Sequence, residues 1–230
     1  MDALTFAQML CSRLCHDLIT PIGAVSSGFE ILEDCDEEDR AKLMDLTRRS
    51  AETASRRLTF YRAAFGHSLA SQHSTFLSIK QLMEGFLTPI KIHLEWHSPE
   101  TLDQNKQFNQ QLTSWGRLLM NIVLTGAEGM PYGGGIQITS VQKNPYFKIN
   151  FTGSFVTVRP EVMQMLKQNS QEETIQTPLV IQVTFVKLLA KQLQVDLVPD
   201  HINNEEFQIQ VIPQQAKNDA FSSTKLSLLV

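Results

Sequence analysis

Apolar residues recur every three or four positions over residues 2–33, which is the spacing of one face of an α-helix. An acidic segment, residues 33–39, follows and is too polar to pack in a core. Its carboxylates suit the first turn of a second helix, because the helix dipole favours negative charge there. The same spacing continues over residues 37–66, which predicts an antiparallel pair of long helices. The two apolar stripes consist of Ala7, Cys11, Leu14, Leu18, Ile22, Val25, Phe29 and Leu32, and of Leu43, Leu46, Ser50, Ala54, Leu58, Tyr61 and Phe65.

A lone hairpin cannot cover both apolar stripes, and two explanations remain open. A second copy of the chain would complete a four-helix bundle across a two-fold axis, with Ser50 and Ala54 allowing the helices to approach closely. Alternatively, the C-terminal half of the chain covers the hairpin within a monomer. The pattern favours the homodimer, with residues 1–66 as the unit that dimerises.

The periodicity changes after Gly66. Residues 67–77 are polar and indicate a linker, and residues 214–230 indicate a loose tail. Several sequential strands with helices between them indicate one mixed sheet covered by a helical layer over residues 78–213, and therefore an α+β chain overall. The expected helices are 78–87, 105–128, 160–168 and 179–192, and the expected strands are 90–97, 135–142, 146–152, 194–199 and 206–212.

Composition narrows the function classes. Apolar residues make up 42% of the chain and charged residues 19%, which is ordinary for a globular protein. No apolar run approaches the length of about 20 residues that a membrane span needs. The N-terminus has Asp2 at its front and Arg13 and His16 within its apolar part, unlike a secretory signal, so we expect a cytoplasmic protein. The formal net charge of −4 argues against nucleic acid as a partner.

The three cysteines, Cys11, Cys15 and Cys35, are too few and too clustered for a disulfide framework. Cys11 and Cys15 lie four residues apart on one predicted helix, but no second Cys or His pair with ligand spacing accompanies them. We therefore expect small buried thiols and no metal site.

The segment around His16 carries the candidate chemistry. Leu14 and Leu18 belong to the apolar stripe, and His16 lies two residues from each, so its side chain should point away from the core. The ordinary pKa of an imidazole is about 6.5, so a neutral, outward-facing ring is a fair nucleophile near neutral pH. The alternative is an ordinary surface histidine.

Three neighbours strengthen the case for His16. Asp17 is close enough to orient the ring or accept its proton, and Thr20 lies one turn along on the same face. Pro21 cannot donate to the carbonyl of Asp17, so a kink is expected just below the histidine. Any one of these residues alone would favour the ordinary surface histidine, but their joint spacing favours a reactive site.

The pattern His-Asp-Leu-x-Thr-Pro on the first helix of a hairpin resembles the phosphoacceptor box of sensor histidine kinases. The fuller string Arg-Leu-Cys-His-Asp-Leu-Ile-Thr-Pro-Ile-Gly-Ala is similar to that of the ChpT-type histidine phosphotransferases of alphaproteobacteria. The resemblance covers nearly the whole chain and implies a helical hairpin followed by a degenerate α/β sandwich related to the histidine-kinase ATPase domain.

The resemblance also implies where nucleotide-binding motifs should lie, and the chain departs from each of them. Asn121 fits the first conserved asparagine, but Thr125 stands where the magnesium-binding asparagine belongs. Phe151 stands in the place of the adenine-binding aspartate. Residues 177–182 replace the glycine-rich phosphate loop and contain no glycine to bring backbone N–H groups near phosphates. The glycines at 133–135 are explained as a turn into a strand, and we expect no cofactor.

The resemblance therefore implies a histidine phosphotransferase. His16 would accept a phosphoryl group from the phosphoaspartate of a receiver domain, such as that of a hybrid histidine kinase, and pass it to response-regulator receiver domains. Any Mg²⁺ would lie in the receiver. Receivers would dock on the first helix near Arg13, Asp17, Thr20 and Gly23. An autophosphorylating kinase core and a non-catalytic dimeric scaffold are the alternatives.

Overall fold

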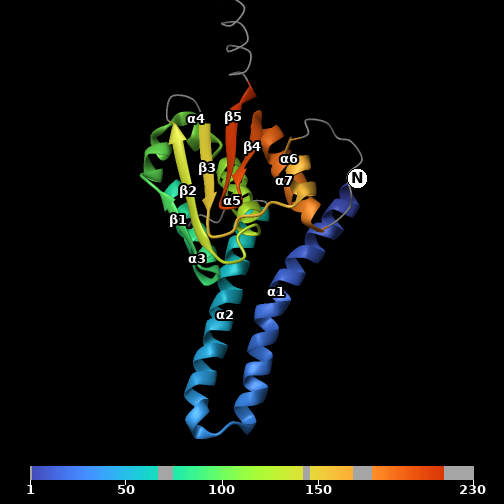
Figure 1. Cartoon of the computed structure of the whole chain (residues 1–230), viewed down its shortest axis with the longest axis vertical. Helices are drawn as coiled ribbons and strands as arrows, with labels where there is room; N and C mark the ends of the chain where they lie inside the picture. Colours follow the sequence, from blue (N-terminus) through green and yellow to red (C-terminus); the bar gives the residue numbers. More distant parts are fainter. Residues whose placement is uncertain (1, 67–74, 142–145, 168–177, 215–230) are drawn as a thin grey trace, which may run out of the picture.

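The computed structural model describes residues 2–66, 75–141, 146–167 and 178–214. Two long helices, α1 (Ala3–Asp34) and α2 (Glu37–Phe65), form the predicted antiparallel hairpin and extend from one side of a sheet domain (Figure 1). Asp2 caps α1, because its Oδ1 accepts a hydrogen bond from the backbone N–H of Thr5 at 2.9 Å. Among the described residues, no helix is long and apolar enough to cross a bilayer.

Helix α1 packs tightly against α2 at Gly28. A Cβ atom at this position would overlap with Thr47 Oγ1, so a larger residue would force the helices apart. Thr47 is itself buried and donates its hydroxyl to the carbonyl of Leu43 at 2.9 Å. Ser50 and Ala54, which we expected to allow close approach of the helices in a dimeric bundle, are half-buried in the single chain.

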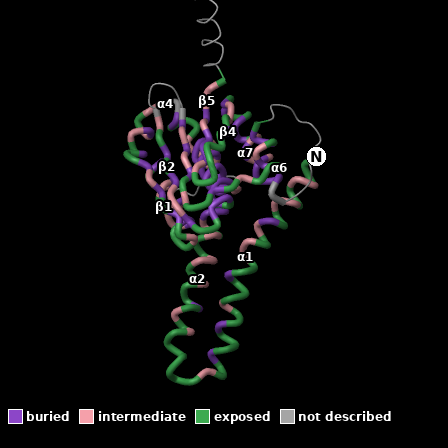
Figure 2. The backbone as a smooth tube through the Cα atoms, in the orientation of Figure 1, coloured by how far each residue is buried: buried purple, intermediate pink, exposed green. Residues whose placement is uncertain are grey.

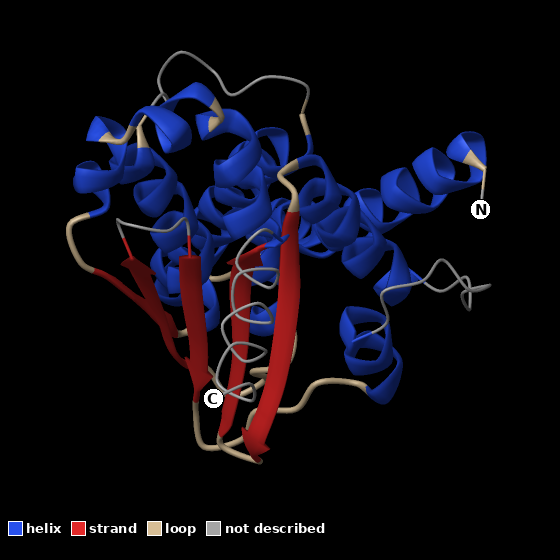
Figure 3. Ribbon diagram, turned by 90° about the horizontal axis from the view of Figure 1, so that it is seen from above, coloured by secondary structure: helices blue, strands red, loops and turns tan. Residues whose placement is uncertain are grey.

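The sheet has five strands in the order β1-β2-β3-β5-β4. Strand β1 runs parallel to β2, and the other neighbours are antiparallel, so the sheet is mixed as predicted. Helices cover one face of it (Figure 3). The strands are β1 (Ile92–Trp96), β2 (Gly134–Val141), β3 (Tyr146–Thr152), β4 (Val195–Asn203) and β5 (Glu206–Pro213); the helices are α3 (Phe76–Leu87), α4 (Lys106–Gln110), α5 (Leu112–Ala127), α6 (Pro160–Lys167) and α7 (Pro178–Gln192), with short 3₁₀ turns at Thr88–Ile90 and Pro99–Gln104.

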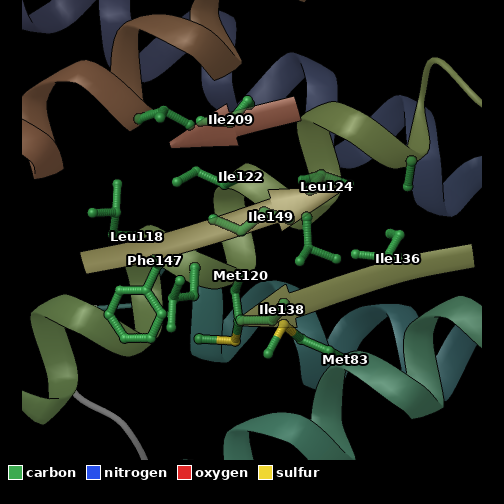
Figure 4. Packing of buried hydrophobic residues seen from close by; sticks show 14 of the residues in the cluster. Met83, Leu118, Met120, Ile122, Leu124, Ile136, Ile138, Phe147, Ile149 and Ile209 are labelled. Atoms are coloured by element: carbon green, nitrogen blue, oxygen red, sulfur yellow. The ribbon is translucent and has the colours of Figure 1, made fainter. Parts of the chain in front are cut away.

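The core lies between the sheet and α5. Alternate residues of β3 face the helices, as the twofold side-chain period of a strand requires, and Phe147 and Ile149 are fully buried (Figure 4). Helix α5 is buried almost all round, which accounts for its nearly continuous apolar sequence. It therefore forms the centre of the domain, and its position fixes where α1 and α2 can pack.

Several boundaries differ from the prediction, such as the end of β4 at Asn203 rather than 199, and two of the differences have a clear physical cause. The expected helix over residues 105–128 divides into α4 and α5 at Gln111. The turn brings the ring of Phe108 into the core, 5.1 Å from the ring of Trp115 and 5.4 Å from that of Phe147. Helix α3 begins at Phe76 rather than 78, because Thr75 caps it by accepting from the N–H of Ser78. Most of the expected linker and tail lies outside the described residues.

The expectation of buried thiols was wrong for Cys11 and Cys15, which are both exposed. The upper part of α1 diverges from α2 and leans toward α7 (Figure 1), where Phe6 lies 6.2 Å from Phe185 between ring centroids. The outer side of α1 is therefore uncovered there. A small side chain gains little from burial, so it tolerates this position.

Candidate phosphoacceptor site

His16 lies on the outer side of α1. Its side chain is 86% exposed, whereas Leu14 and Leu18 pack against the core. The helical spacing predicted this direction correctly. The ring is therefore accessible to a group that a second protein presents.

Asp17 is the residue that couples His16 to the rest of the molecule. Its side chain is 29% exposed, and its Oδ1 lies 3.6 Å from His16 Nδ1. The other carboxylate oxygen, Oδ2, accepts a hydrogen bond from the hydroxyl of Tyr61 at 3.0 Å. The backbone carbonyl of Asp17 accepts from Arg57 Nη1 at 2.8 Å. Two side chains of α2 thus hold the residue that adjoins the histidine.

Burial is the main cause that raises the pKa of Tyr61 above its ordinary value, and the nearby Asp17 carboxylate raises it further. The phenol consequently stays protonated at neutral pH. It can therefore serve Asp17 as a hydrogen-bond donor at neutral pH.

Arg13 does not lie on the open surface where we expected receivers to contact it. The residue is 7% exposed, and its guanidinium forms an ion pair with Glu128, next to the C-terminal end of α5. Burial lowers the pKa of Arg13, and the charge of Asp17 opposes that shift. Arg13 therefore joins α1 to the sheet domain rather than facing a partner.

Thr20 and Gly23 do lie on the exposed side of α1. Gly23 is seven residues, or nearly two turns, from His16 and so shares its face. A Cβ atom at Gly23 would meet nothing within 4 Å. Packing within this chain therefore does not require a glycine there. No side chain projects from this position on the face of α1 that carries His16.

Asn121 and Thr125, which we expected at the positions of a kinase's magnesium site, are hydrogen-bonded to each other, and Asn121 is also bonded to α2. The side-chain amide of Asn121 donates to the carbonyl of Ala64 at 3.0 Å and accepts from Gln182 Nε2 at 2.6 Å. Thr125 donates its hydroxyl to the carbonyl of Asn121 at 2.8 Å. All three side chains are buried. These polar groups therefore form hydrogen bonds within the protein.

An aromatic ring occupies the expected adenine position. Phe151 is fully buried and stacks on Phe207, with ring centroids 5.6 Å apart. Gly126 packs so closely against this ring that a Cβ atom there would overlap with it. Leu179 to Gln182 lie in the first turns of α7, where the phosphate loop was expected, whereas Thr177 lies outside the described residues. Gly133 and Gly134, both at positive φ, form the turn into β2.

Sequence reasoning missed Arg57, and it assigned Tyr61 only to the apolar stripe. One signal could have found them. Pro21 leaves the carbonyl of Asp17 without its helical donor, so a donor had to come from elsewhere. Arg57 and Tyr61 lie four residues apart on α2 and are polar at one end. Within the described residues, no group of three or more His, Cys, Asp or Glu side chains is placed to hold a metal ion.

The family and the known proteins that this chain is similar to include histidine phosphotransferases and other phosphotransferases. Residues 76–201 match the family described as histidine phosphotransferase C-terminal domain. The chain is 32% identical to the protein phosphotransferase ChpT of Brucella abortus (strain 2308) over 197 residues, which span 84% of this chain and 88% of that protein. It also resembles a solved structure of a bacterial phosphotransferase, with a TM-score of 0.72 and 25% identity over 92% of this chain and 97% of that one.

Proposed function

The chain belongs to the histidine phosphotransferase family, and from this premise we propose that His16 is the side chain that carries the phosphoryl group in a phosphorelay. The observation that carries the proposal is the combination of an exposed imidazole with a carboxylate held beside one of its nitrogens. His16 Nδ1 lies 3.6 Å from Asp17 Oδ1, which leaves Nε2 on the far side of the ring. A proton on Nδ1 gives Nε2 a free lone pair.

The reaction is an in-line displacement at phosphorus. Nε2 of neutral His16 forms a bond to the phosphorus of a receiver's aspartyl phosphate, while the bond from phosphorus to the aspartyl oxygen breaks and releases a carboxylate. Asp17 stabilises the positive charge that develops on the imidazole. An aspartate oxygen of a second receiver then forms a bond to phosphorus while the bond from phosphorus to Nε2 breaks, and the electron pair returns to the neutral ring. Positioning supplies most of the catalysis in such transfers, and Mg²⁺ would be held by the receiver.

Receiver domains are the partners that this chemistry requires. The donor is the receiver domain of a hybrid histidine kinase, and the acceptors are response regulators. Asp17, Thr20 and Gly23 mark the surface of α1 on which they dock, because these residues adjoin His16 and the surface around Gly23 is unobstructed. Arg13 supports this surface from inside through its ion pair with Glu128.

The phosphoryl group comes from a receiver and not from ATP. The supporting observations are the buried ring of Phe151 at the adenine position and the pairing of Asn121 with Gln182. Opening either place would break interactions of the folded core, so neither is available to a nucleotide.

The functional unit is a homodimer formed through the hairpin. Most residues in the lower part of the hairpin are exposed, as the green tube in Figure 2 shows, and large apolar side chains are among the exposed residues over 19–58. Burying a side chain of this size in an interface yields about 1.5–3 kcal/mol. A second hairpin would cover them and complete a four-helix bundle. The exposed residues are Ile19, Ile22, Phe29, Ile31, Met44, Leu46 and Leu58.

The decisive experiment incubates the purified chain with a phosphorylated receiver and measures acid-labile phosphate on the chain. We expect wild type to be labelled and His16→Ala to remain unlabelled while folding normally, because removing an exposed ring changes the stability by about 0.5 kcal/mol or less. His97→Ala is the matched control, since His97 is also exposed and also pairs with a carboxylate, that of Glu95. Full labelling of His16→Ala would refute the site, and an unlabelled wild type would favour a non-catalytic scaffold.

A further inference from the structure

Pro21 interrupts the backbone hydrogen bonds of α1. A proline has no backbone N–H, so the carbonyl of Asp17, four residues earlier, lacks the donor that a regular helix would provide. Arg57 Nη1 supplies a donor at 2.8 Å from the neighbouring helix. A hydrogen bond to this oxygen fixes the backbone of Asp17 relative to α2, at the point where α1 would otherwise be free to bend.

Tyr61 acts one turn further along α2. Arg57 and Tyr61 are four residues apart and so lie on the same face of the helix. The tyrosine ring is held in the core, with its centroid 6.1 Å from that of Phe86 and 6.0 Å from that of Phe65, so its hydroxyl has a fixed position. That hydroxyl binds Asp17 Oδ2 at 3.0 Å, which turns Oδ1 toward His16 Nδ1. One carboxylate oxygen of Asp17 thus accepts from Tyr61, and the other lies beside the imidazole of His16.

We propose that Arg57 and Tyr61 are positioning residues for phosphotransfer, and that they act on His16 through Asp17. They touch neither the imidazole nor the incoming group. By fixing the backbone and the carboxylate of Asp17, they keep the His16 proton on Nδ1 and the lone pair on Nε2. This inference rests on the proposed function of His16 for its effect on rate, but its effect on the ring proton needs no partner protein.

The first test uses Tyr61→Phe in the full-length chain, because this change removes the hydroxyl and keeps the packed ring. Nitrogen NMR of histidine-labelled protein reports which ring nitrogen carries the proton, and the spectrum of His16→Ala identifies the His16 signals. We expect wild type to hold the proton on Nδ1 and Tyr61→Phe to shift toward the Nε2–H form. The labelling rate at saturating receiver should fall about tenfold, equivalent to about 1.4 kcal/mol of barrier, with an unchanged KM.

Matched variants separate positioning from general damage. Tyr132→Phe removes an exposed hydroxyl and should behave as wild type in both measurements. Arg57→Met should reproduce the loss, and Arg57→Lys, which retains a cationic donor, should recover part of it. Wild-type proton placement and rate in folded Tyr61→Phe and Arg57→Met would overturn the positioning role. A wild-type chain that takes no phosphoryl group would overturn the proposed function instead, while the NMR result would still decide the role of the two residues.

Discussion

The hairpin and the sheet domain bury their apolar residues to very different extents. In the sheet domain most of the large aromatic residues are buried, Tyr132 and Phe155 being exposed. The exposed apolar side chains there are spread over separate elements, such as Leu77 on α3, Leu188 on α7 and Ile202 on β4. In the hairpin, eight large apolar side chains remain exposed on two helices, and they include Phe29, Leu46 and Leu58. Isolated exposed apolar residues are normal on a protein surface, whereas a concentration of them indicates an interface.

The polar residues differ in the same way. Asn121, Thr125 and Gln182 of the sheet domain are buried and hydrogen-bonded to one another. In the hairpin site His16 and Thr20 are exposed, whereas Arg13 and Asp17 are held by contacts within the chain. The comparison teaches that the sheet domain covers most of its large apolar residues within the chain, whereas the hairpin leaves many exposed, and we propose that other chains cover them. Each prediction below tests one side of this difference.

The largest expected effect is loss of the dimer in Leu58→Asp. Leu58 is 57% exposed in the single chain, and in a four-helix bundle its side chain would meet the second hairpin. An unpaired carboxylate buried there would cost several kcal/mol, which is enough to separate the two chains at micromolar concentration. Sedimentation should show a wild-type dimer and a folded monomeric variant.

Leu188→Asp is the matched control, because Leu188 is a similarly exposed leucine, at 44%, on α7 of the sheet domain. It should leave the dimer intact. A monomeric wild type, or equal dissociation of both variants, would contradict the difference between the two regions.

The sequence predicted the hairpin well because its signal is local. Thirty residues of helical period on each side of an acidic turn admit few other structures, and helices α1 and α2 begin and end within one or two residues of the prediction. His16 faces outward for the same reason, since its direction depends on the helical repeat alone. Local periodicity therefore gave the outward direction of His16.

Contacts between distant segments were not predictable in this way. Arg13 lies on the first helix among residues that face solvent, and yet it is buried. Its partner in an ion pair is Glu128, which lies 115 positions later in the chain. Gly28 was omitted from the apolar stripe because it has no side chain, although its lack of one is what lets α2 approach. Tyr61 was assigned to packing, and its hydroxyl contact with Asp17 depends on how the two helices are set against each other.

The second largest effect is expected inside the sheet domain, for Asn121→Ala. This change removes the donor to the Ala64 carbonyl and the acceptor for Gln182, and leaves both groups buried without that partner. Leaving buried polar groups unpaired should lower the free energy of unfolding by about 2–3 kcal/mol. Asn109→Ala is the control, because Asn109 makes an exposed hydrogen bond to the Asp103 carbonyl and should cost about 0.5 kcal/mol or less. Urea denaturation at one protein concentration measures both, and equal losses would contradict the prediction.

A smaller effect is expected for Gly23→Leu on the hairpin surface. Because a side chain at Gly23 meets nothing within 4 Å, the variant should fold normally, and its stability should rise by up to about 1 kcal/mol from the better helix propensity of leucine. Receiver binding should weaken by about 1 kcal/mol or more, because the added side chain would obstruct a docked partner beside His16.

Gly23→Leu should therefore stabilise the fold while it weakens receiver binding, so damage to the fold could not explain a loss of affinity. Asp36→Leu is the control for binding, since Asp36 precedes α2 at the far end of the hairpin and its side chain makes no capping hydrogen bond. Calorimetric affinities for a receiver, measured together with oligomeric state, decide the matter. Unchanged affinity in Gly23→Leu would remove this surface from the receiver interface.

The smallest expected effect is none at all, when ATP and Mg²⁺ are added to the wild-type chain. A nucleotide present at about 100 times its dissociation constant would add about 2.7 kcal/mol to the stability and raise the melting temperature measurably. The adenine would have to displace Phe151 from between Gly126 and Phe207, and the phosphates would meet the first turns of α7 instead of a glycine loop. Thermal melting with and without nucleotide, and self-labelling by ATP, should both show no change. A reproducible shift that requires Mg²⁺ would mean that the sheet domain is not closed after all, and it would restore a kinase core as an explanation for His16.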